Sequence, residues 1–344
     1  MAEARTAVLA RAAVLAALAL TVVLTSCQLL NQSQAVNGAS GKITWPKDGD
    51  LWVYDLATKQ QTKITNLNAG AAVTGATWSP DGQRVIFAQF WRRPNERSSG
   101  ADLMVANADG SDAHPFAERD APNTVLETPE WLQSGTVYYT IRRVANGRET
   151  QTIVRQKEGG QPEVVQDNAY DPAPSSDEAT LVYVRSIGTG QIMMKKTIGE
   201  SGDGCELLSD RVFQYLSLPR ISPDDKRVAF GGSGEPNMGP SGCGGDPNSS
   251  TPSASSGLDL GALLQPDTAY AHGLPADVYS MNLDGSDMKR IADIKDDDPT
   301  VAWAPDGAKV AIFGVAALFL TDATGGSPAK LVQPGGYGGL DWTR

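Results

Sequence analysis

The chain has 344 residues, of which 40 are acidic and 29 basic, and a formal net charge of −11. An acidic chain repels nucleic acid and anionic lipid surfaces, which excludes these as its main partners. Two histidines and three cysteines are too few for a His-rich metal centre, so we expect neither a metal nor a cofactor.

The first 26 residues have the features of an export signal. Arg5 and Arg11 precede an apolar run at 12–24, and the sequence Leu-Thr-Ser-Cys ends at Cys27. A basic start, a short apolar centre and small residues before a cleavage point are typical of a secretory signal peptide. The four residues Leu24-Thr-Ser-Cys27 resemble a bacterial lipobox, which implies cleavage before Cys27 and lipid attachment to its thiol. An ordinary signal peptide with an unrelated cysteine is the alternative.

Residues 27–40 are small and polar, and we expect them to form a lipidated tether. Because Gln28 is not Asp, the lipobox resemblance implies the periplasmic side of the outer membrane in a bacterium with two membranes. In a bacterium with one membrane, the anchor would lie on the outer face of the cell membrane. The sequence leaves the type of host open.

One unit recurs through residues 41–344. It consists of an apolar strand that ends in an anchor residue, a tight turn of the Ser-Pro-Asp-Gly kind, and a second apolar strand. Full copies occupy 78–85, 221–228 and 303–310, and looser copies occupy 131–138 and 174–181. A unit that repeats every few tens of residues cannot bury its apolar face alone, so it must stack on its neighbours.

Each full unit continues with a third strand that ends in an Asp-Gly turn, as at 109–110 and 284–285, and with a short fourth strand. Asp-Gly supplies the positive φ angles of tight hairpins. Four antiparallel strands per repeat predict the blade of a β-propeller. The expected blades are 73–117, 125–166, 168–209, 213–293 with a long insertion at 232–276, and 297–333.

The two ends of this region complement each other. Segment 41–66 contains three predicted strands and lacks a first strand, whereas segment 338–344 has the pattern of a first strand alone. A sixth blade built from both ends would close the ring and leave no open sheet edge. The predicted fold is therefore all-β, a six-bladed β-propeller of four-stranded antiparallel blades, with the C-terminal strand joining the N-terminal blade.

The turns Trp78-Ser-Pro-Asp-Gly82, Ile221-Ser-Pro-Asp-Asp225 and Trp303-Ala-Pro-Asp-Gly307 resemble the WD40-like (PD40) repeats of TolB-like six-bladed propellers. The resemblance extends over residues 41–344 and implies a binding propeller. It specifies fold far better than function. TolB has an additional N-terminal α/β domain and no lipid anchor, so a role in the Tol–Pal envelope system does not follow.

Loops between second and third strands, and the links between blades, vary widely in predicted length. Variable loops on a rigid scaffold commonly carry function, and we expect the recognition side there. The candidate binding residues in or near these loops are Trp91, Arg92, Arg93, Arg97, Arg142, Arg143 and Arg185. Arg beside Trp suits a carboxylate, a phosphate or a protein hot spot. A solvated basic rim is the alternative.

Three further features are candidates for a site. Cys205 and Cys243 are an even pair in an exported chain, which favours a disulfide, although Cys205 starts an outer strand expected far from the insertion. His114 and His272 are expected at the surface. The acidic segment 293–299 is expected to link two blades, with a calcium site as the alternative.

The expected function is that of a monomeric, lipid-anchored, non-catalytic scaffold for a protein or a cell-envelope polymer. The alternative is a channel-mouth enzyme or small-ligand receptor, such as a hydrolase or lyase acting on an acidic sugar or peptide. First-strand positions expected near the axis, at 73–77, 128, 170–171, 216–217 and 299–301, are mostly apolar or small. Enzymes need acids and bases at the site, so this composition disfavours catalysis.

Overall fold

The computed structural model describes residues 36–188, 190–208, 213, 215–233, 243 and 275–343. Strands β1 to β24 make up the fold of these residues, and the prediction of an all-β fold is confirmed for them. The predicted signal peptide, the lipobox Cys27, His272 and most of the 232–276 insertion lie outside the described residues.

Alternating apolar residues and tight turns produce antiparallel sheets of four strands. One sheet has the order β24-β1-β2-β3 and contains β1 (Lys42–Lys47), β2 (Asp50–Asp55), β3 (Gln60–Lys63) and β24 (Asp341–Thr343). A second contains β12 (Tyr170–Pro174), β13 (Thr180–Ile187), β14 (Gly190–Thr197) and β15 (Cys205–Leu208).

Two further sheets follow the same order along the chain. One contains β16 (Tyr215–Ile221), β17 (Arg227–Ser233), β18 (Pro275–Asn282) and β19 (Lys289–Asp297). The other contains β20 (Thr300–Trp303), β21 (Lys309–Phe313), β22 (Leu318–Asp322) and β23 (Ala329–Val332). Most of segment 293–299, which we expected to be a link, therefore belongs to strand β19. Its Asp296 is buried and accepts a hydrogen bond from the Ala316 backbone N–H.

The remaining strands form an eight-stranded sheet made of two four-stranded meanders. They are β4 (Ala72–Trp78), β5 (Arg84–Trp91), β6 (Gly100–Asn107), β7 (His114–Ala117), β8 (Thr124–Trp131), β9 (Thr136–Ala145), β10 (Arg148–Lys157) and β11 (Glu163–Asp167). A single parallel pair, Ala101 with Val125, joins the two meanders.

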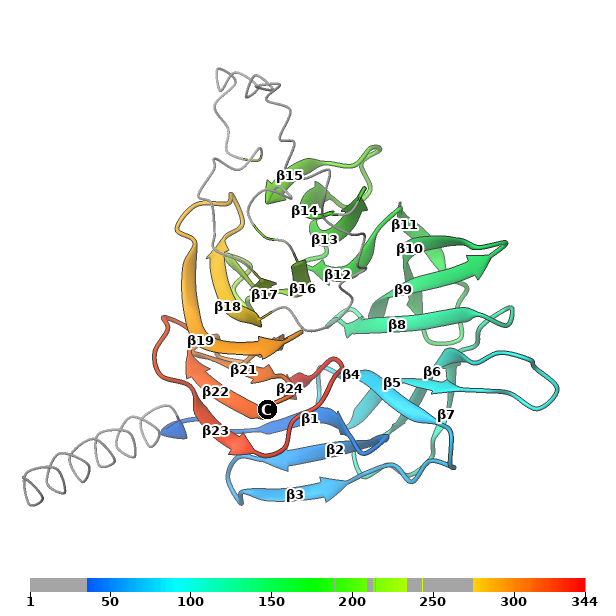
Figure 1. Ribbon diagram of the computed structural model, residues 1–344, viewed down its shortest axis with the longest axis horizontal. Helices are drawn as coiled ribbons and strands as arrows, with labels where there is room; N and C mark the ends of the chain where they lie inside the picture. The colour runs from blue at the N-terminus through cyan, green and yellow to red at the C-terminus, as the bar shows by residue number, and fades with distance from the viewer. Residues whose placement is uncertain are drawn as a thin grey trace, which may run out of the picture.

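The first strands of the meanders lie together at the centre of the molecule, and the fourth strands lie at its periphery (Figure 1). Each inner strand contacts the next in the series β4, β8, β12, β16, β20 and β24, and β24 contacts β4 in turn. Strand β24 also pairs with β1, with Trp342 opposite Ile43. The inner strands therefore surround a common axis.

Hydrophobic clusters lie between neighbouring sheets. Phe87 and Trp78 of the β4–β7 meander pack with Val53 of β2. Tyr138 of the β8–β11 meander packs with Tyr183 of the β12–β15 sheet. The largest cluster joins the β20–β23 sheet to the sheet that contains β1 and β24. Because each sheet buries both faces against its neighbours, no sheet has an independent core.

Three aspartates at or near the start of third strands connect each of those strands to the link that leaves its sheet. They are buried or nearly so, and each accepts a backbone N–H hydrogen bond from the residue 17 positions later: Asp50 from Leu67 (2.8 Å), Asp102 from Arg119 (2.8 Å) and Asp277 from Ile294 (3.0 Å). These bonds satisfy backbone donors at the point where the chain turns inward toward the axis.

Candidate binding site at the axial mouth

A cavity of about 360 Å³ opens on the axis at the side of the molecule that carries the turns between first and second strands. We call this cavity, lined by Thr77, Glu130, Arg220, Ala302 and Asp341, the axial mouth. Its volume lies in the range typical of ligand sites. It lies on the side opposite to the one where the sequence placed recognition.

The lining residues share one position in the repeat. Each directly precedes an anchor residue: Thr77 before Trp78, Glu130 before Trp131, Arg220 before Ile221, Ala302 before Trp303 and Asp341 before Trp342. The corresponding residue of β12 is Ala173, before Pro174. Side chains alternate along a strand, so one register presents the same repeat position to the axis in every copy.

Glu130 and Arg220 form an ion pair in the mouth. Arg220 Nε lies 2.7 Å from Glu130 Oε1, and Arg220 Nη1 donates to the carbonyl of Pro219. Burial raises the pKa of Glu130 to about 7, while Arg220 opposes the rise and Asp341 adds to it. Among the described residues, Glu130 Oε2 and Arg220 Nη2 have no hydrogen-bond partner.

Asp341 connects the last strand to the next inner strand. Its Oδ2 accepts hydrogen bonds from the Trp78 N–H (2.7 Å) and from Thr77 Oγ1 (3.1 Å), which joins β24 to β4. Burial raises the pKa of Asp341, against the lowering effect of the Trp78 and Trp342 N–H groups. Asp341 therefore joins β24 to β4 and also places a carboxyl group at the mouth.

Deeper along the axis, bulges redirect the inner strands. The pairing register shifts at 127–130 of β8, at 170–173 of β12 and at 217–220 of β16, and Thr128, Asp171 and Leu218 have positive φ angles. A β-branched residue such as Thr128 rarely adopts this conformation. Bulges re-aim side chains, and backbone strain of this kind clusters at functional sites.

The bulges bring acidic side chains together near the axis. Burial raises the pKa of Asp171 to about 7, and the charges of Glu127 and Asp298 add to the shift while Arg220 opposes it. Burial also raises the pKa of Glu127, which pairs with Arg142 at 3.0 Å. Besides the positions expected near the axis, which included Asp171, the first strands contribute Glu127, Glu130, Arg220 and Asp341.

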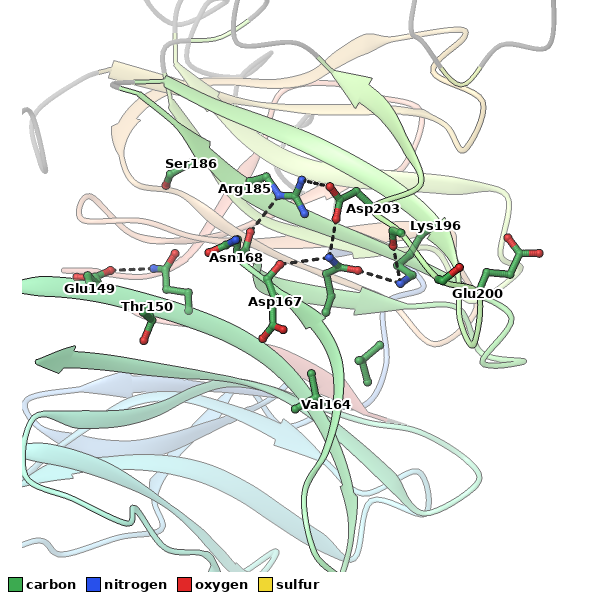
Figure 2. A pocket seen from close by; sticks show the side chains of 15 residues that line it. Glu149, Thr150, Val164, Asp167, Asn168, Arg185, Ser186, Lys196, Glu200 and Asp203 are labelled. Atoms are coloured by element: carbon green, nitrogen blue, oxygen red, sulfur yellow. Dashed lines mark hydrogen bonds and ion pairs between the residues drawn. The ribbon is translucent and has the colours of Figure 1, made fainter.

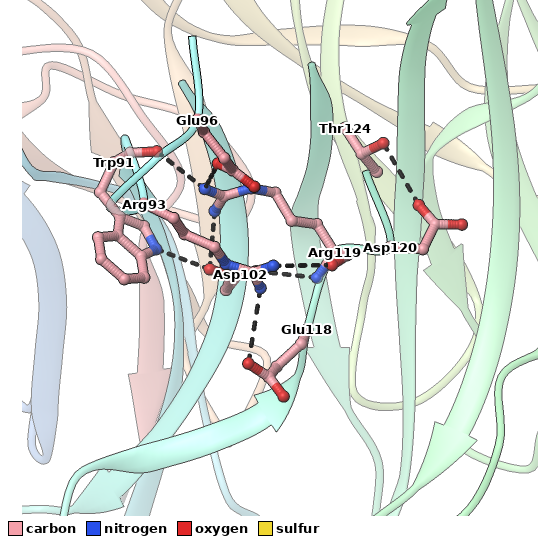
Figure 3. A network of polar contacts seen from close by, with 8 residues as sticks. All are labelled: Trp91, Arg93, Glu96, Asp102, Glu118, Arg119, Asp120 and Thr124. Atoms are coloured by element: carbon pink, nitrogen blue, oxygen red, sulfur yellow. Dashed lines mark hydrogen bonds and ion pairs between the residues drawn. The ribbon is translucent and has the colours of Figure 1, made fainter. Parts of the chain in front are cut away.

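The structure resolves the predicted Trp–Arg cluster into separate contacts. Trp91 and Arg93 belong to a closed network around buried Asp102, which accepts from Trp91 Nε1 (2.6 Å), Arg93 Nη2 (2.7 Å) and Arg119 Nη1 (2.7 Å) (Figure 3). Glu96 also accepts from Arg119 at 2.6 Å. This network holds the loop between β5 and β6 against its sheet.

The remaining arginines of that prediction lie apart from this network. Arg142 pairs with Glu127, Arg143 with Asp120 (2.9 Å) and Arg185 with Asp203 (2.7 Å). Arg92 and Arg97 are exposed. Since most of the guanidinium groups already have carboxylate partners, the structure does not bring them together into one basic surface.

A lateral groove of about 760 Å³ lies between the β8–β11 and β12–β15 meanders (Figure 2). Arg185, Asp203 and buried Lys196 line it, and Lys196 Nζ donates to Gln166 Oε1 and to the Gly202 carbonyl. Its polar groups largely bond to one another. We therefore interpret the groove as the interface between two meanders.

The other candidate residues occupy separate places. A disulfide joins Cys205, at the start of β15, to Cys243, with a Cα–Cα distance of 5.3 Å. His114 is exposed on β7. Among the residues that the structure describes, no group of three or more His, Cys, Asp or Glu side chains is arranged to hold a metal ion. The same residues contain no helix that is long and apolar enough to cross a membrane.

No protein-family model matches the sequence, and no curated protein matches it either. Solved structures do match. TolB from Acinetobacter baumannii is similar with a TM-score of 0.55 and 10% identity, over 88% of this chain and 66% of that chain. This chain thus spans slightly less than two thirds of that TolB.

Two other propeller structures match over most of their own length. A putative TolB from Agrobacterium tumefaciens has a TM-score of 0.56 and 15% identity, over 87% of this chain and 92% of that one. A chain of a nidogen/laminin complex has a TM-score of 0.60 and 9% identity, over 89% and 99%. At such identities the matches show the fold alone, and they confirm the predicted TolB-like β-propeller fold.

Proposed function

We propose that this chain is an exported, lipid-anchored scaffold that binds a protein partner at the axial mouth without catalysing a reaction. The observation that carries the proposal is the cavity itself, where inner strands from successive repeats converge and where Glu130 and Arg220 keep unused hydrogen-bonding groups. A rigid scaffold that presents unsatisfied polar groups in a cavity is suited to recognition. Fold similarity to TolB and to a propeller crystallised in a nidogen/laminin complex supports a protein as the partner.

The proposal includes a ring of six blades, with the eight-stranded sheet counted as two. The cyclic contacts of the inner strands, the β24–β1 pairing and the hydrophobic cluster between the β20–β23 sheet and the first sheet support this arrangement. It also includes anchoring through a lipidated Cys27, on the periplasmic side of an outer membrane or on the outer face of a cell membrane, which the lipobox resemblance supports.

Site-specific photo-cross-linking in intact cells tests the proposed side of recognition. Gln133 is exposed at the axial mouth, whereas Arg92 is exposed on the loop that follows β5. A photoreactive amino acid at position 133 is expected to yield a discrete protein adduct, and the same group at position 92 is expected to yield none. An adduct at 92 with none at 133 would place recognition on the opposite side and refute the proposal.

A second candidate is an enzyme at the same cavity. Burial raises the pKa of Glu130 to about 7 in a cavity that Asp341 also lines, and a carboxylic acid that titrates near neutral pH can act as a general acid. A hydrolase or lyase for acidic oligosaccharides or peptides is the form this candidate takes. Turnover of oligouronides or peptides by the wild type, lost in Glu130→Gln, would favour it over the scaffold.

A further inference from the structure

The axial mouth combines acceptors and donors that a single ligand must satisfy together. Glu130 offers Oε2 as a free acceptor, and the carboxyl group of Asp341 lines the same cavity. Arg220 is only 8% exposed and lines the cavity, yet its Nη2 has no partner among the described residues. A bare cation would satisfy the carboxylates but would offer no acceptor to the Arg220 guanidinium, whereas a peptide segment can supply both a cationic side chain and a carbonyl acceptor.

The surface around the mouth is acidic. The turns between first and second strands carry exposed Asp81, Asp177, Asp224 and Asp306. Lys226, on one of these turns, is already paired with Asp224. Complementary charge selects and steers a partner, so this side of the molecule favours a basic one.

A second groove extends the mouth outward. It has a volume of about 410 Å³ and shares Pro223, Trp303 and Pro305 with the axial cavity. The two cavities adjoin at these shared residues, and we call the pair the trench, which runs from the axis across the turns that follow β16 and β20. A trench is shaped for an extended chain, whose backbone offers carbonyl acceptors at regular intervals.

We propose that the axial mouth receives one basic side chain, Lys or Arg, of an extended peptide segment in a partner protein. The basic group donates to Glu130 Oε2 with Asp341 beside it, and a backbone carbonyl of the same segment accepts from Arg220 Nη2. Residues on one side of the basic residue follow the trench past Trp303. This inference rests on the proposed function, because it specifies the chemistry of the same site.

Selection from a random 12-residue peptide library displayed on phage tests the inference, with the full chain immobilised in detergent as the target. Enriched peptides are expected to share Lys or Arg at one position. Their affinity is expected to fall at least tenfold in Glu130→Gln, and also when the basic residue is replaced by norleucine. Asp81→Asn removes a carboxylate from the same side outside the cavity and is the matched control, expected to change affinity less than twofold. Circular dichroism verifies that each variant is folded.

The outcomes separate this inference from the proposed function. Gln133→Trp adds bulk at the rim of the mouth and reports whether a peptide binds there. Peptides that Gln133→Trp excludes, but that lack a shared basic residue or ignore Glu130→Gln, would overturn the inference and leave a peptide-binding mouth. Peptides that none of the mouth variants affects, or a selection that yields no binder, would count against both. A glycan that Glu130→Gln releases while no peptide binds would also overturn the inference.

Discussion

Arg220 on β16 and Glu130 on β8 form an ion pair across an intervening sheet, with Arg220 Nε 2.7 Å from Glu130 Oε1. The β12–β15 sheet separates the two strands along the chain, and its residue at the same repeat position is Ala173. A small side chain there leaves space for the pair to meet. The ion pair therefore connects two meanders that are not consecutive in the chain.

Loss of the guanidinium is expected to destabilise the protein. Arg220→Met leaves Glu130 and Asp341 close together without a cation, and breaking a buried pair in this way costs about 3 kcal/mol. Urea unfolding of Arg220→Met, Glu130→Gln and the double variant measures the coupling. The double variant is expected to recover part of the loss. Additive effects of the two changes would show that the pair contributes nothing.

Stability is expected to fall as the pH rises from about 5 to 8. The pKa of Asp171 is raised to about 7 in the folded chain from an ordinary 3.8 when unfolded. Between these values the folded chain binds more protons than the unfolded chain, so the free energy of unfolding decreases with pH. The groups that face Asp171 are Glu127, Asp298 and Arg220, and Glu130 shifts in the same direction.

Asp171→Asn tests this pH dependence directly. Asparagine can still accept the hydrogen bond from the Leu218 N–H, and it never carries the buried charge. Its melting temperature is expected to match that of the wild type near pH 5 and to exceed it by several degrees at pH 8. A wild-type melting temperature that rises between pH 5 and 8, unaltered by the substitution, would contradict the assignment.

Asp102→Asn is expected to destabilise the chain by about 3 kcal/mol, because buried Arg119 and half-buried Arg93 lose a carboxylate partner. Chemical denaturation measures the loss. Asp109→Asn is the matched control on the same sheet, since Asp109 is exposed and, among the described residues, bonds only to Ser111 in its own turn. Its expected effect is under 1 kcal/mol, and equal losses in the two variants would contradict a special role for the network.

Removal of residues 338–344 is expected to prevent stable folding. Trp342 is 5% exposed, and its Nε1 donates to the Ser40 carbonyl, so the deletion leaves one edge of β1 unpaired and opens a hydrophobic cluster. Trp342→Ala, a milder change, is expected to cost about 4 kcal/mol. Thermal unfolding measures both, and a truncated chain with an unchanged melting temperature would contradict the prediction.

Cys27→Ser is expected to release the protein from the membrane fraction, because acyl chains would no longer be attached. Fractionation of cells that express the variant and the wild type measures this. The anchor prediction fails if the variant sediments with membranes as the wild type does.

The repeat boundaries could be predicted from the sequence because turn residues mark the ends of the strands in each repeat. The predicted unit 125–166 is observed as Thr124–Asp167, and the pairing of the two chain ends rested on complementary fragments. Local turn chemistry and strand alternation suffice for such assignments. The residues of the axial mouth could have been found by comparing the position before the anchor residue in each copy of the repeat. Glu130 and Asp341 occupy this position where other copies have Thr77 and Ala302.

The contacts of the loop arginines could not be predicted from loop length. The binding site was predicted from arginines in or near long loops, but Arg93 and Arg142 bond to carboxylates that neighbouring strands supply. Pairing of this kind depends on three-dimensional proximity between residues distant in sequence. The bulges that aim Asp171 and Glu127 toward the axis also leave no pattern in a single sequence, because they arise from register shifts between strands.

The pairing of β24 with β1 also constrains when the protein can fold. Trp342 reaches Ser40 across 302 residues, so the earliest strand to be synthesised waits for the latest before its sheet is complete. Contacts this distant in sequence slow folding. If the chain is exported through a pore from its N-terminus, the sheet that contains β1 can be completed only after the C-terminal strand has also passed through.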